Sequence, residues 1–233
     1  MSLISMDLEE ATVEKTFRSK KNKVQKINYD GKYFVLKEYN PEFLEGLKIE
    51  KDLLESCEER GILVPKIIKA KNDTLILEYI SGKNCKRLFD KIEDVKVKKR
   101  ILSNIASWLA KFHKEFELKK RRGDSILANF ISTDEKVYGI DFEEAEEGDP
   151  YIDVGDMCTS IMRLRPAFTE ERFSQTKFFL NEYFFKSLAP YKDMTEQVSR
   201  SLIHYSKYSS MGDLMKEWAE KIRSNGLSST LQS

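Results

Sequence analysis

The stretch from Arg122 to Asp141 constrains the fold of this 233-residue chain more than any other. It contains two short runs that are typical of strands, at residues 129–131 and 137–140. Residues 132–135, Ser-Thr-Asp-Glu, lie between them and are typical of a turn. Two short runs of strand-forming residues on either side of such a turn predict a β-hairpin.

Three polar side chains, Asp124, Asn129 and Asp141, stand at defined places around this predicted hairpin. We expect the hairpin to bring Asn129 near Asp141, with Asp124 on the loop that leads into it. One carboxylate could then orient a hydroxyl and accept its proton, while an Asp/Asn pair bound Mg²⁺ at the phosphates. Phosphoryl transfer needs these three groups together. The plainer alternative is that these residues only form turns, as Asp and Asn commonly do.

The pattern Asp124-x-x-x-x-Asn129, then a hairpin, then Asp141-Phe142 resembles the catalytic and metal-binding loops of the protein-kinase-like fold. Gly123-Asp124 in front, and Asp141-Phe142-Glu143 with Asp153-Val154-Gly155-Asp156 behind, look most like the aminoglycoside and choline phosphotransferase branch. That branch usually has His-Gly-Asp where this protein has Arg122-Gly123-Asp124.

The resemblance implies a two-lobed α+β fold that uses ATP and Mg²⁺. A small β-rich lobe, residues 1–80, would bind the nucleotide, and a larger, mostly helical lobe, residues 81–233, would hold the catalytic and acceptor-binding parts. The resemblance also implies a role for each matching residue: Asp124 is the base that orients the acceptor hydroxyl, and Asn129 and Asp141 hold the metal ion.

The N-terminal part is expected to be β-rich, with strand-like runs at residues 13–17, 24–28 and 33–39. Residues 29–32, Tyr-Asp-Gly-Lys, are a strong turn signal between the last two runs. Lys37 alternates with apolar residues in the third run, which could point it inward, although a solvent-facing lysine is the common case. The resemblance assigns Lys37 to the strand lysine that contacts the α- and β-phosphates.

A helix is expected from about Pro41 to Arg60 because apolar residues recur there at helical spacing. Glu50 lies inside it, and the resemblance implies that Glu50 pairs with Lys37. Glu55 and Glu58 are nearby competitors for that role, and any of the three could instead lie on the solvent face.

The apolar run from Leu75 to Gly82 resembles the hinge that joins the two lobes of this fold. By this resemblance, main-chain groups of Glu78, Tyr79 and Ile80 would meet the adenine ring. Their side chains carry little information because the contacts are with the backbone.

The rest of the chain is expected to be helical, beginning with a long core helix that includes residues 101–116. His113 on this helix is expected to be structural. The acidic run at residues 143–149 could attract a cationic substrate, but a solvated loop is the more common role. Asp153 resembles the aspartate that hydrogen-bonds the catalytic-loop backbone, and Asp156 is a candidate helix start.

Two features depart from the resemblance. The loop expected over the phosphates, residues 18–23, contains no glycine, although glycine normally lets the backbone approach phosphate closely. Ser19, Asn22 and the lysines would have to serve instead, or nucleotide binding would be weak or absent. We expect Arg122 to pair with Asp153 or with nearby backbone carbonyls, the alternative being that it continues an exposed basic run.

Charge and cysteine content exclude some classes of function. Forty basic and 39 acidic residues leave a net charge of +1, so no overall field favours nucleic acid or an anionic membrane. The three cysteines, Cys57, Cys85 and Cys158, have no CxxC spacing, which indicates a reducing cytoplasm. No apolar run is long enough to span a bilayer.

The sequence therefore predicts an ATP-dependent phosphotransferase with a small-molecule acceptor such as an amino sugar, a choline-like amine or a sugar. The segment between Asp141 and Asp153 is too short for the activation segment of a regulated protein kinase. Three alternatives stay open: a lipopolysaccharide-core sugar kinase, an atypical protein kinase of the RIO type or of the kind that accompanies the tRNA-modifying complex, and a pseudokinase that binds a protein partner.

Overall fold

A computed structural model of the protein describes residues 10–231. Within these residues the protein forms two compact units. The first comprises residues 10–81 and 138–145, and the second comprises residues 82–137 and 146–231. The backbone therefore leaves the first unit once, returns to it for one short segment, and leaves it again.

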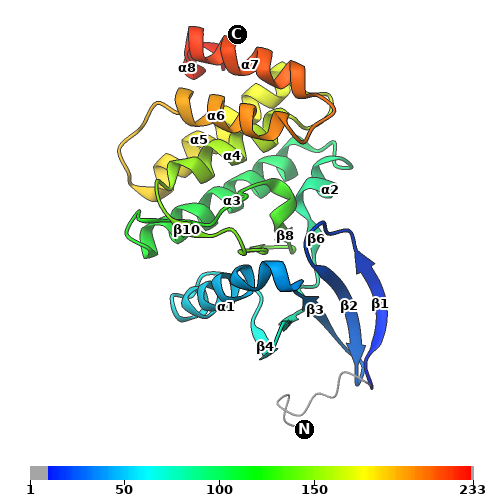
Figure 1. The fold of residues 1–233 in the computed structure, drawn as a ribbon. Coiled ribbons are helices and arrows are strands. Elements are labelled where there is room, and N and C mark those ends of the chain that lie inside the picture. The colour runs from blue at the N-terminus through cyan, green and yellow to red at the C-terminus, as the bar shows by residue number, and fades with distance from the viewer. Residues whose placement is uncertain (1–9, 232–233) are drawn as a thin grey trace. The chain divides into compact units, whose positions relative to one another are not determined.

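The first unit is built on a five-stranded antiparallel sheet with the order β1-β2-β3-β5-β4 (Figure 1). One long helix, α1, packs against β4 and β5 of this sheet. The elements are β1 (Thr12–Phe17), β2 (Lys23–Tyr29), β3 (Lys32–Glu38), the 3₁₀ turn η3 (Pro41–Phe43), α1 (Leu44–Glu59), β4 (Ile67–Lys71) and β5 (Thr74–Glu78). The three predicted N-terminal strands and the predicted helix are thus present, with ends shifted by a few residues.

The turn between β2 and β3 follows from its sequence. Asp30 and Gly31 have positive φ angles of 50° and 73°, which a tight hairpin turn requires and which Asp and Gly tolerate. The main-chain N–H of Gly31 also donates to Asn28 Oδ1 at 3.1 Å. This turn sets the register that pairs Lys37 with Val24 on β2, and so decides which face of the sheet Lys37 occupies.

The second unit consists mainly of helices that stack in layers, with α3 against α5, α4 against α5 and α6, and α6 against α7 (Figure 1). In this unit β6 pairs with β8 and β7 pairs with β10, and β9 begins at Val137 and continues into the segment 138–145 that belongs to the first unit. The helices are α2 (Cys85–Phe89), α3 (Val95–Glu115), the 3₁₀ turn η4 (Leu127–Asn129), α4 (Tyr151–Met162), α5 (Glu170–Ser187), α6 (Thr195–Ser206), α7 (Gly212–Asn225) and α8 (Leu227–Thr230). The strands are β6 (Lys83–Asn84), β7 (Lys120–Arg121), β8 (Phe130–Ser132), β9 (Val137–Gly139) and β10 (Glu146–Glu147). A β-rich unit and a helical unit confirm the expected α+β class.

The long helix α3 is the predicted core helix. Asp94 caps its start by accepting the main-chain N–H groups of Lys96 and Val97 at 2.7 and 3.4 Å. Its buried face carries the apolar residues that predicted it: Ile101, Ile105, Trp108, Leu109 and Phe112. Burying such a stripe is what stabilises a helix of this length in a globular protein.

Helices α4 and α6 approach closely at Gly155. A Cβ atom there would lie 2.9 Å from the backbone carbonyl carbon and oxygen of Gln197, so only glycine fits. The prediction that Asp156 starts a helix was wrong, because α4 begins five residues earlier, at Tyr151. Asp149 accepts the Tyr151 N–H at 2.9 Å and so takes the role expected of Asp156.

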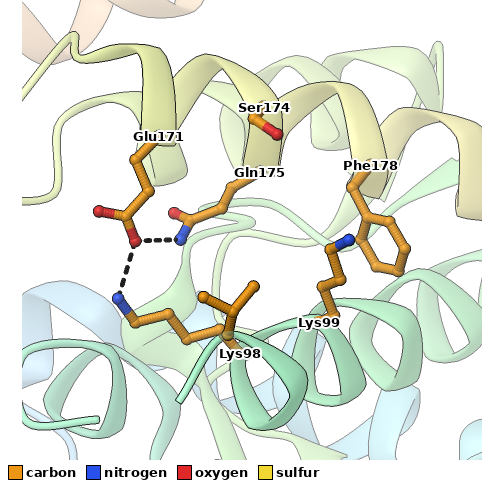
Figure 2. Close-up of a pocket in the computed structure, with 7 residues that line it drawn as sticks. Lys98, Lys99, Glu171, Ser174, Gln175 and Phe178 are labelled. Carbon is orange, nitrogen blue, oxygen red and sulfur yellow. Dashed lines mark hydrogen bonds and ion pairs between the residues drawn. The ribbon is translucent and has the colours of Figure 1, made fainter. Parts of the chain in front are cut away.

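A small hollow lies between α3 and α5 (Figure 2). Lys98 Nζ lies 2.8 Å from Glu171 Oε1, which also accepts a hydrogen bond from Gln175 at 2.8 Å. The residues that line it are Val95, Lys98, Lys99, Glu171, Ser174, Gln175 and Phe178. None of the predicted site residues is among them, and we assign this hollow no role in the chemistry. No helix within residues 10–231 combines the length and apolar character needed to cross a membrane.

Candidate active site

Lys37 is the centre of a charged cluster in the first unit. Its side chain is 6% exposed, and its Nζ lies 2.6 Å from Glu50 Oε2 and 2.7 Å from Asp141 Oδ1. Burial alone would lower the pKa of Lys37, but the carboxylates of Glu50 and Asp141 outweigh it and raise the pKa. Lys37 is therefore a fixed cation inside the unit, and the interpretation of a solvent-facing lysine is wrong.

Glu50 is held in place by three donors. Besides Lys37, the Tyr39 hydroxyl donates to Glu50 Oε2, and the main-chain N–H of Phe142 donates to Oε1 at 3.2 Å. Glu50 is 1% exposed, whereas its two competitors on α1 are exposed. A buried carboxylate needs this degree of pairing, because an uncompensated charge in the interior is very costly.

Glu143 joins the same cluster, and the sequence did not predict this. Its Oε2 lies 3.1 Å from Lys37 Nζ and accepts the Asn22 amide at 2.6 Å. Lys21 Nζ lies 3.4 Å from Glu143 and 2.5 Å from Glu144. The interpretation of residues 143–149 as a solvated loop is therefore wrong for Glu143, whose side chain is only 14% exposed.

The glycine-free loop at residues 18–23 is held by side-chain hydrogen bonds. Asn22 is 6% exposed, and its Oδ1 accepts the main-chain N–H of Asn40 at 3.3 Å. Ser19 Oγ accepts the main-chain N–H of Asn22 at 3.3 Å, and the Asn40 amide donates to the carbonyl of Lys21. These bonds give the loop a defined conformation without the backbone freedom of glycine.

Three carboxylates in this cluster could contribute to a cation site. Oxygen atoms of Glu50, Asp141 and Glu143 all lie within 4.8 Å of one another. Asp141 is the most accessible of them, with 44% of its side chain exposed. Carboxylate oxygens are the ligands that a hard divalent cation prefers.

The second unit holds the other predicted cluster, around Asp124. Its two carboxylate oxygens accept different donors: the Tyr205 hydroxyl at 2.7 Å on Oδ1 and the Asn129 amide at 2.9 Å on Oδ2. The Asn129 amide also donates to the carbonyl of Asp124 at 2.9 Å. Asn129 closes the 3₁₀ turn η4 and is not part of a strand, which corrects the predicted strand limits by one residue.

Both predicted acidic residues have strained backbone. Asp124 has a φ angle of 34° and Asp141 a φ angle of 63°, and Gly123 in front of Asp124 has a φ angle of 69°. A positive φ is uncommon for residues other than glycine and costs of order 1–3 kcal/mol, and such residues cluster at functional sites.

Asp153 supports the loop that carries Asp124. It is fully buried, and its Oδ2 accepts the main-chain N–H of Arg122 at 2.6 Å, as the resemblance implied. The same oxygen lies 3.1 Å from His113 Nε2, and His113 Nδ1 lies 2.9 Å from the Tyr183 hydroxyl. His113 is thus enclosed by the core, in the structural role expected of it.

Arg122 is also fully buried, so the interpretation that it continues an exposed basic run is wrong. Its Nη1 donates to the carbonyls of Gly123 and Asp124 at 3.1 and 2.9 Å. Its guanidinium carbon lies 5.0 Å from the ring centre of Phe130. The side chain therefore braces the Asp124 loop through the carbonyls, one of the two arrangements predicted for it.

The three predicted hinge residues follow one another at the end of β5. Glu78 is the last residue of the strand, and Tyr79 and Ile80 come directly after it. The Glu78 N–H donates to the carbonyl of Lys66 at 2.8 Å, and Lys26 Nζ lies 4.4 Å from the ring centre of Tyr79. Whether these residues meet an adenine stays a prediction.

Buried Asp156 leads to a pH prediction. Burial raises the pKa of Asp156 to about 7, and the Ser201 hydroxyl, which donates to Oδ1 at 2.7 Å, offsets this only in part. Asp153 and Asp124 raise it further, and Arg121 lowers it. The pKa of Asp156 is higher in the folded protein than in the unfolded chain, so the neutral carboxyl favours the folded state. This contribution to the free energy of unfolding is complete below the unfolded pKa and is lost as pH rises through about 7.

We therefore expect the free energy of unfolding to fall by about 2 kcal/mol between pH 5 and pH 7 on account of this group. Urea unfolding at the two pH values, for the wild type and for Asp156→Asn, measures the effect. Asparagine resembles the neutral carboxyl, so the variant should lose most of this pH dependence. An unchanged pH dependence in Asp156→Asn would show that another group is responsible.

Sequence reasoning missed the roles of three residues. Glu143 directly follows Asp141-Phe142, and this position could have predicted that its side chain lies near Lys37. Asn22 was expected only to serve in the loop over the phosphates, and its side-chain hydrogen bond to Glu143 was not predicted. Tyr205 was one of many aromatic residues near the C-terminus, and nothing local distinguished it from the others.

Comparison with known proteins places this geometry in context. No protein-family model matches the sequence. Over 102 residues the protein is 30% identical to the KEOPS complex subunit Bud32 of Pyrococcus abyssi, a match that spans 43% of this chain and 44% of that protein. The match therefore spans less than half the length of this curated relative.

Solved structures match over nearly the whole length of the protein. A macrolide 2′-phosphotransferase from Brachybacterium faecium has a TM-score of 0.64 at 16% identity, covering 93% of this chain and 92% of that one. Amicoumacin kinase in complex with AMP-PNP, Ca²⁺ and Ami has a TM-score of 0.63 at 12% identity, covering 95% of this chain and 90% of that one. A choline kinase from Cryptosporidium parvum has a TM-score of 0.53 at 14% identity, covering 98% and 90%. The protein therefore has the same fold as these solved kinases and phosphotransferases, the protein-kinase-like fold.

Proposed function

We propose that this protein transfers the γ-phosphate of ATP to a hydroxyl group of a small molecule. The observation that carries the proposal is the position of Lys37, buried between Glu50 and Asp141. A lysine and carboxylates held in this way are what binding of nucleotide phosphates with a divalent cation requires. Residues that only formed turns would not need to bury a cation among carboxylates.

In the proposed reaction the first unit binds the nucleotide and the second unit binds the acceptor. Lys37 binds the phosphates, and Glu50 fixes Lys37. The acceptor oxygen forms a bond to the γ-phosphorus while the bond from that phosphorus to the bridging oxygen of ADP breaks, and Asp124 orients the hydroxyl and takes its proton. Main-chain groups of Glu78, Tyr79 and Ile80 bind the adenine.

The ligand chemistry of two predicted residues, each taken by itself, suits a magnesium ion. Asp141 offers an accessible carboxylate, and Asn129 uses its amide nitrogen for its hydrogen bonds to Asp124, which leaves the amide oxygen as its ligand atom. We propose Asp141 and Asn129 as the ligands. Bound there with ATP, the ion would supply positive charge to the phosphate oxygens.

The direct test is whether Mg-ATP stabilises the folded protein. A ligand that binds only the folded state adds about 2.7 kcal/mol at a hundredfold excess over its dissociation constant, which is roughly 5–10 °C in melting temperature for a protein of this size. Differential scanning fluorimetry with Mg-ATP should show this rise, and Lys37→Met should reduce it. No rise at millimolar Mg-ATP would favour a pseudokinase, for which the glycine-free loop is the main argument.

The match to Bud32 favours a second candidate, an atypical protein kinase whose acceptor is a serine or threonine of another protein. Incubation with ATP and either a metabolite panel or a cell extract, followed by mass spectrometry, separates the two candidates. A phosphorylated metabolite supports the first proposal, and a phosphorylated protein supports the second.

A further inference from the structure

The Tyr205 hydroxyl marks the oxygen of Asp124 beside which an acceptor hydroxyl would lie. It donates to Asp124 Oδ1 at 2.7 Å, which is the hydrogen bond that an acceptor makes to a base before it loses its proton. Burial, Asp156 and Asp124 all raise the pKa of Tyr205, so the phenol stays neutral and acts as the donor. The surroundings of Tyr205 therefore describe the surroundings of the acceptor, if Asp124 has the role proposed above.

Arg163 is the charged residue that covers Tyr205. It stands at the C-terminal end of α4, and its guanidinium carbon lies 4.6 Å from the centre of the Tyr205 ring. The side chain is half-buried, and no carboxylate within residues 10–231 lies at ion-pair distance from it. Other arginines of this unit, such as Arg121 and Arg200, do pair with glutamates.

This arrangement bears on the charge of the acceptor. A cationic acceptor could bind the face of an aromatic ring, but Arg163 already occupies a face of Tyr205 and would repel a second cation. A half-buried guanidinium without a carboxylate has donors left for an anion, and carboxylates and phosphates are the groups that its planar fork matches best.

We propose that Arg163 and Tyr205 form an acceptor subsite that selects a hydroxyl compound carrying an anionic substituent, a carboxylate or a phosphate ester. The ring of Tyr205 holds the guanidinium beside the position of the reacting hydroxyl, and Arg163 binds the anionic group of the acceptor. An amino sugar or a choline-like amine, which the sequence had suggested, is disfavoured at this subsite. The inference rests on the proposed function for the identity of the base, but anion binding by Arg163 can be measured without any turnover.

The first experiment measures binding alone. Inorganic phosphate and glucuronate are titrated by calorimetry into the wild type, Arg163→Gln, Arg163→Lys and Arg200→Gln. Arg200 is the matched control, since it lies on the same helix as Tyr205 and pairs with Glu196 at 2.5 Å. We expect Arg163→Gln to weaken binding of at least one anion about tenfold or more, Arg163→Lys to retain part of it, and Arg200→Gln to leave it unchanged. Equal affinity in the wild type and Arg163→Gln, or no binding to the wild type, would overturn the proposal.

The second experiment separates this subsite from the phosphotransferase activity. ADP release is measured with glucosamine, glucose, glucuronate and glucose 6-phosphate, sugars that share one scaffold and differ in charge. The wild type should favour an anionic sugar through a lower KM, and Arg163→Gln should abolish the ratio between anionic and neutral sugars. If anion binding depends on Arg163 but no sugar is phosphorylated, the result supports the subsite and contradicts the proposed phosphoryl transfer. If sugars are phosphorylated without a preference for anionic ones, the result supports phosphoryl transfer and contradicts the subsite.

Discussion

Replacing Asp124 with asparagine should lower phosphoryl transfer by about 10²–10⁴-fold, the range that general base catalysis contributes, while Mg-ATP binding stays nearly intact. Asp124 accepts the Tyr205 hydroxyl on one oxygen and the Asn129 amide on the other. Asparagine keeps one acceptor but cannot take a proton, so the acceptor hydroxyl loses its base. One of the two donors also loses its partner, which should cost about 1 kcal/mol of stability.

Asp141→Asn should give the opposite pattern. It removes a charged ligand from the proposed cation site and one carboxylate from Lys37, so Mg-dependent nucleotide affinity should fall first. Single-turnover kinetics and calorimetric titration of Mg-ATP separate the two effects. Asp134→Asn, an exposed aspartate in the turn between β8 and β9, is the matched control and should change neither. If both variants lost ATP affinity equally, the division of roles between Asp124 and Asp141 would be wrong.

Local chemistry explains why much of the fold could be predicted. The turn at Asp30-Gly31 requires positive φ angles that few residues tolerate, so the hairpin could be predicted from these two residues. Glu50 was predicted through the family resemblance, and its spacing agrees, since it lies three, four and seven residues before the buried Leu53, Leu54 and Cys57. Such signals depend on neighbours within one or two helical turns.

The parts that could not be predicted depend on distant pairs of residues. Asn22 and Glu143 are 121 positions apart, and Tyr205 and Asp124 are 81 positions apart. Nothing near Tyr205 distinguishes it from Tyr208, which is exposed. The close approach of α4 and α6 at Gly155 joins parts of the chain more than 40 residues apart, and the partner of such a helix contact cannot be identified from local sequence.

Arg122→Ala should lower the free energy of unfolding by about 3–5 kcal/mol and reduce turnover with it. The side chain is fully buried and fills the space beside Phe130. Truncation would leave a cavity there and would remove the donor that the carbonyls of Gly123 and Asp124 share. Since Asp124 has a φ angle of 34°, loss of this brace should let the loop relax away from the conformation that presents the carboxylate.

The cause of this loss can be separated with two further variants. Arg122→His restores the residue usual in the phosphotransferase branch, whose ring can pack and donate one hydrogen bond, and it should retain most of the activity. Arg200→Ala, which removes an exposed arginine, should cost less than about 1 kcal/mol. Urea unfolding gives the stabilities, and turnover is measured well below the melting temperature of each variant. An alanine variant with unchanged unfolding and turnover would mean that two other hydrogen bonds hold the Asp124 loop without the Arg122 side chain: the one that Asp153 accepts from the main-chain N–H of residue 122 and the one that Asn129 donates to the Asp124 carbonyl.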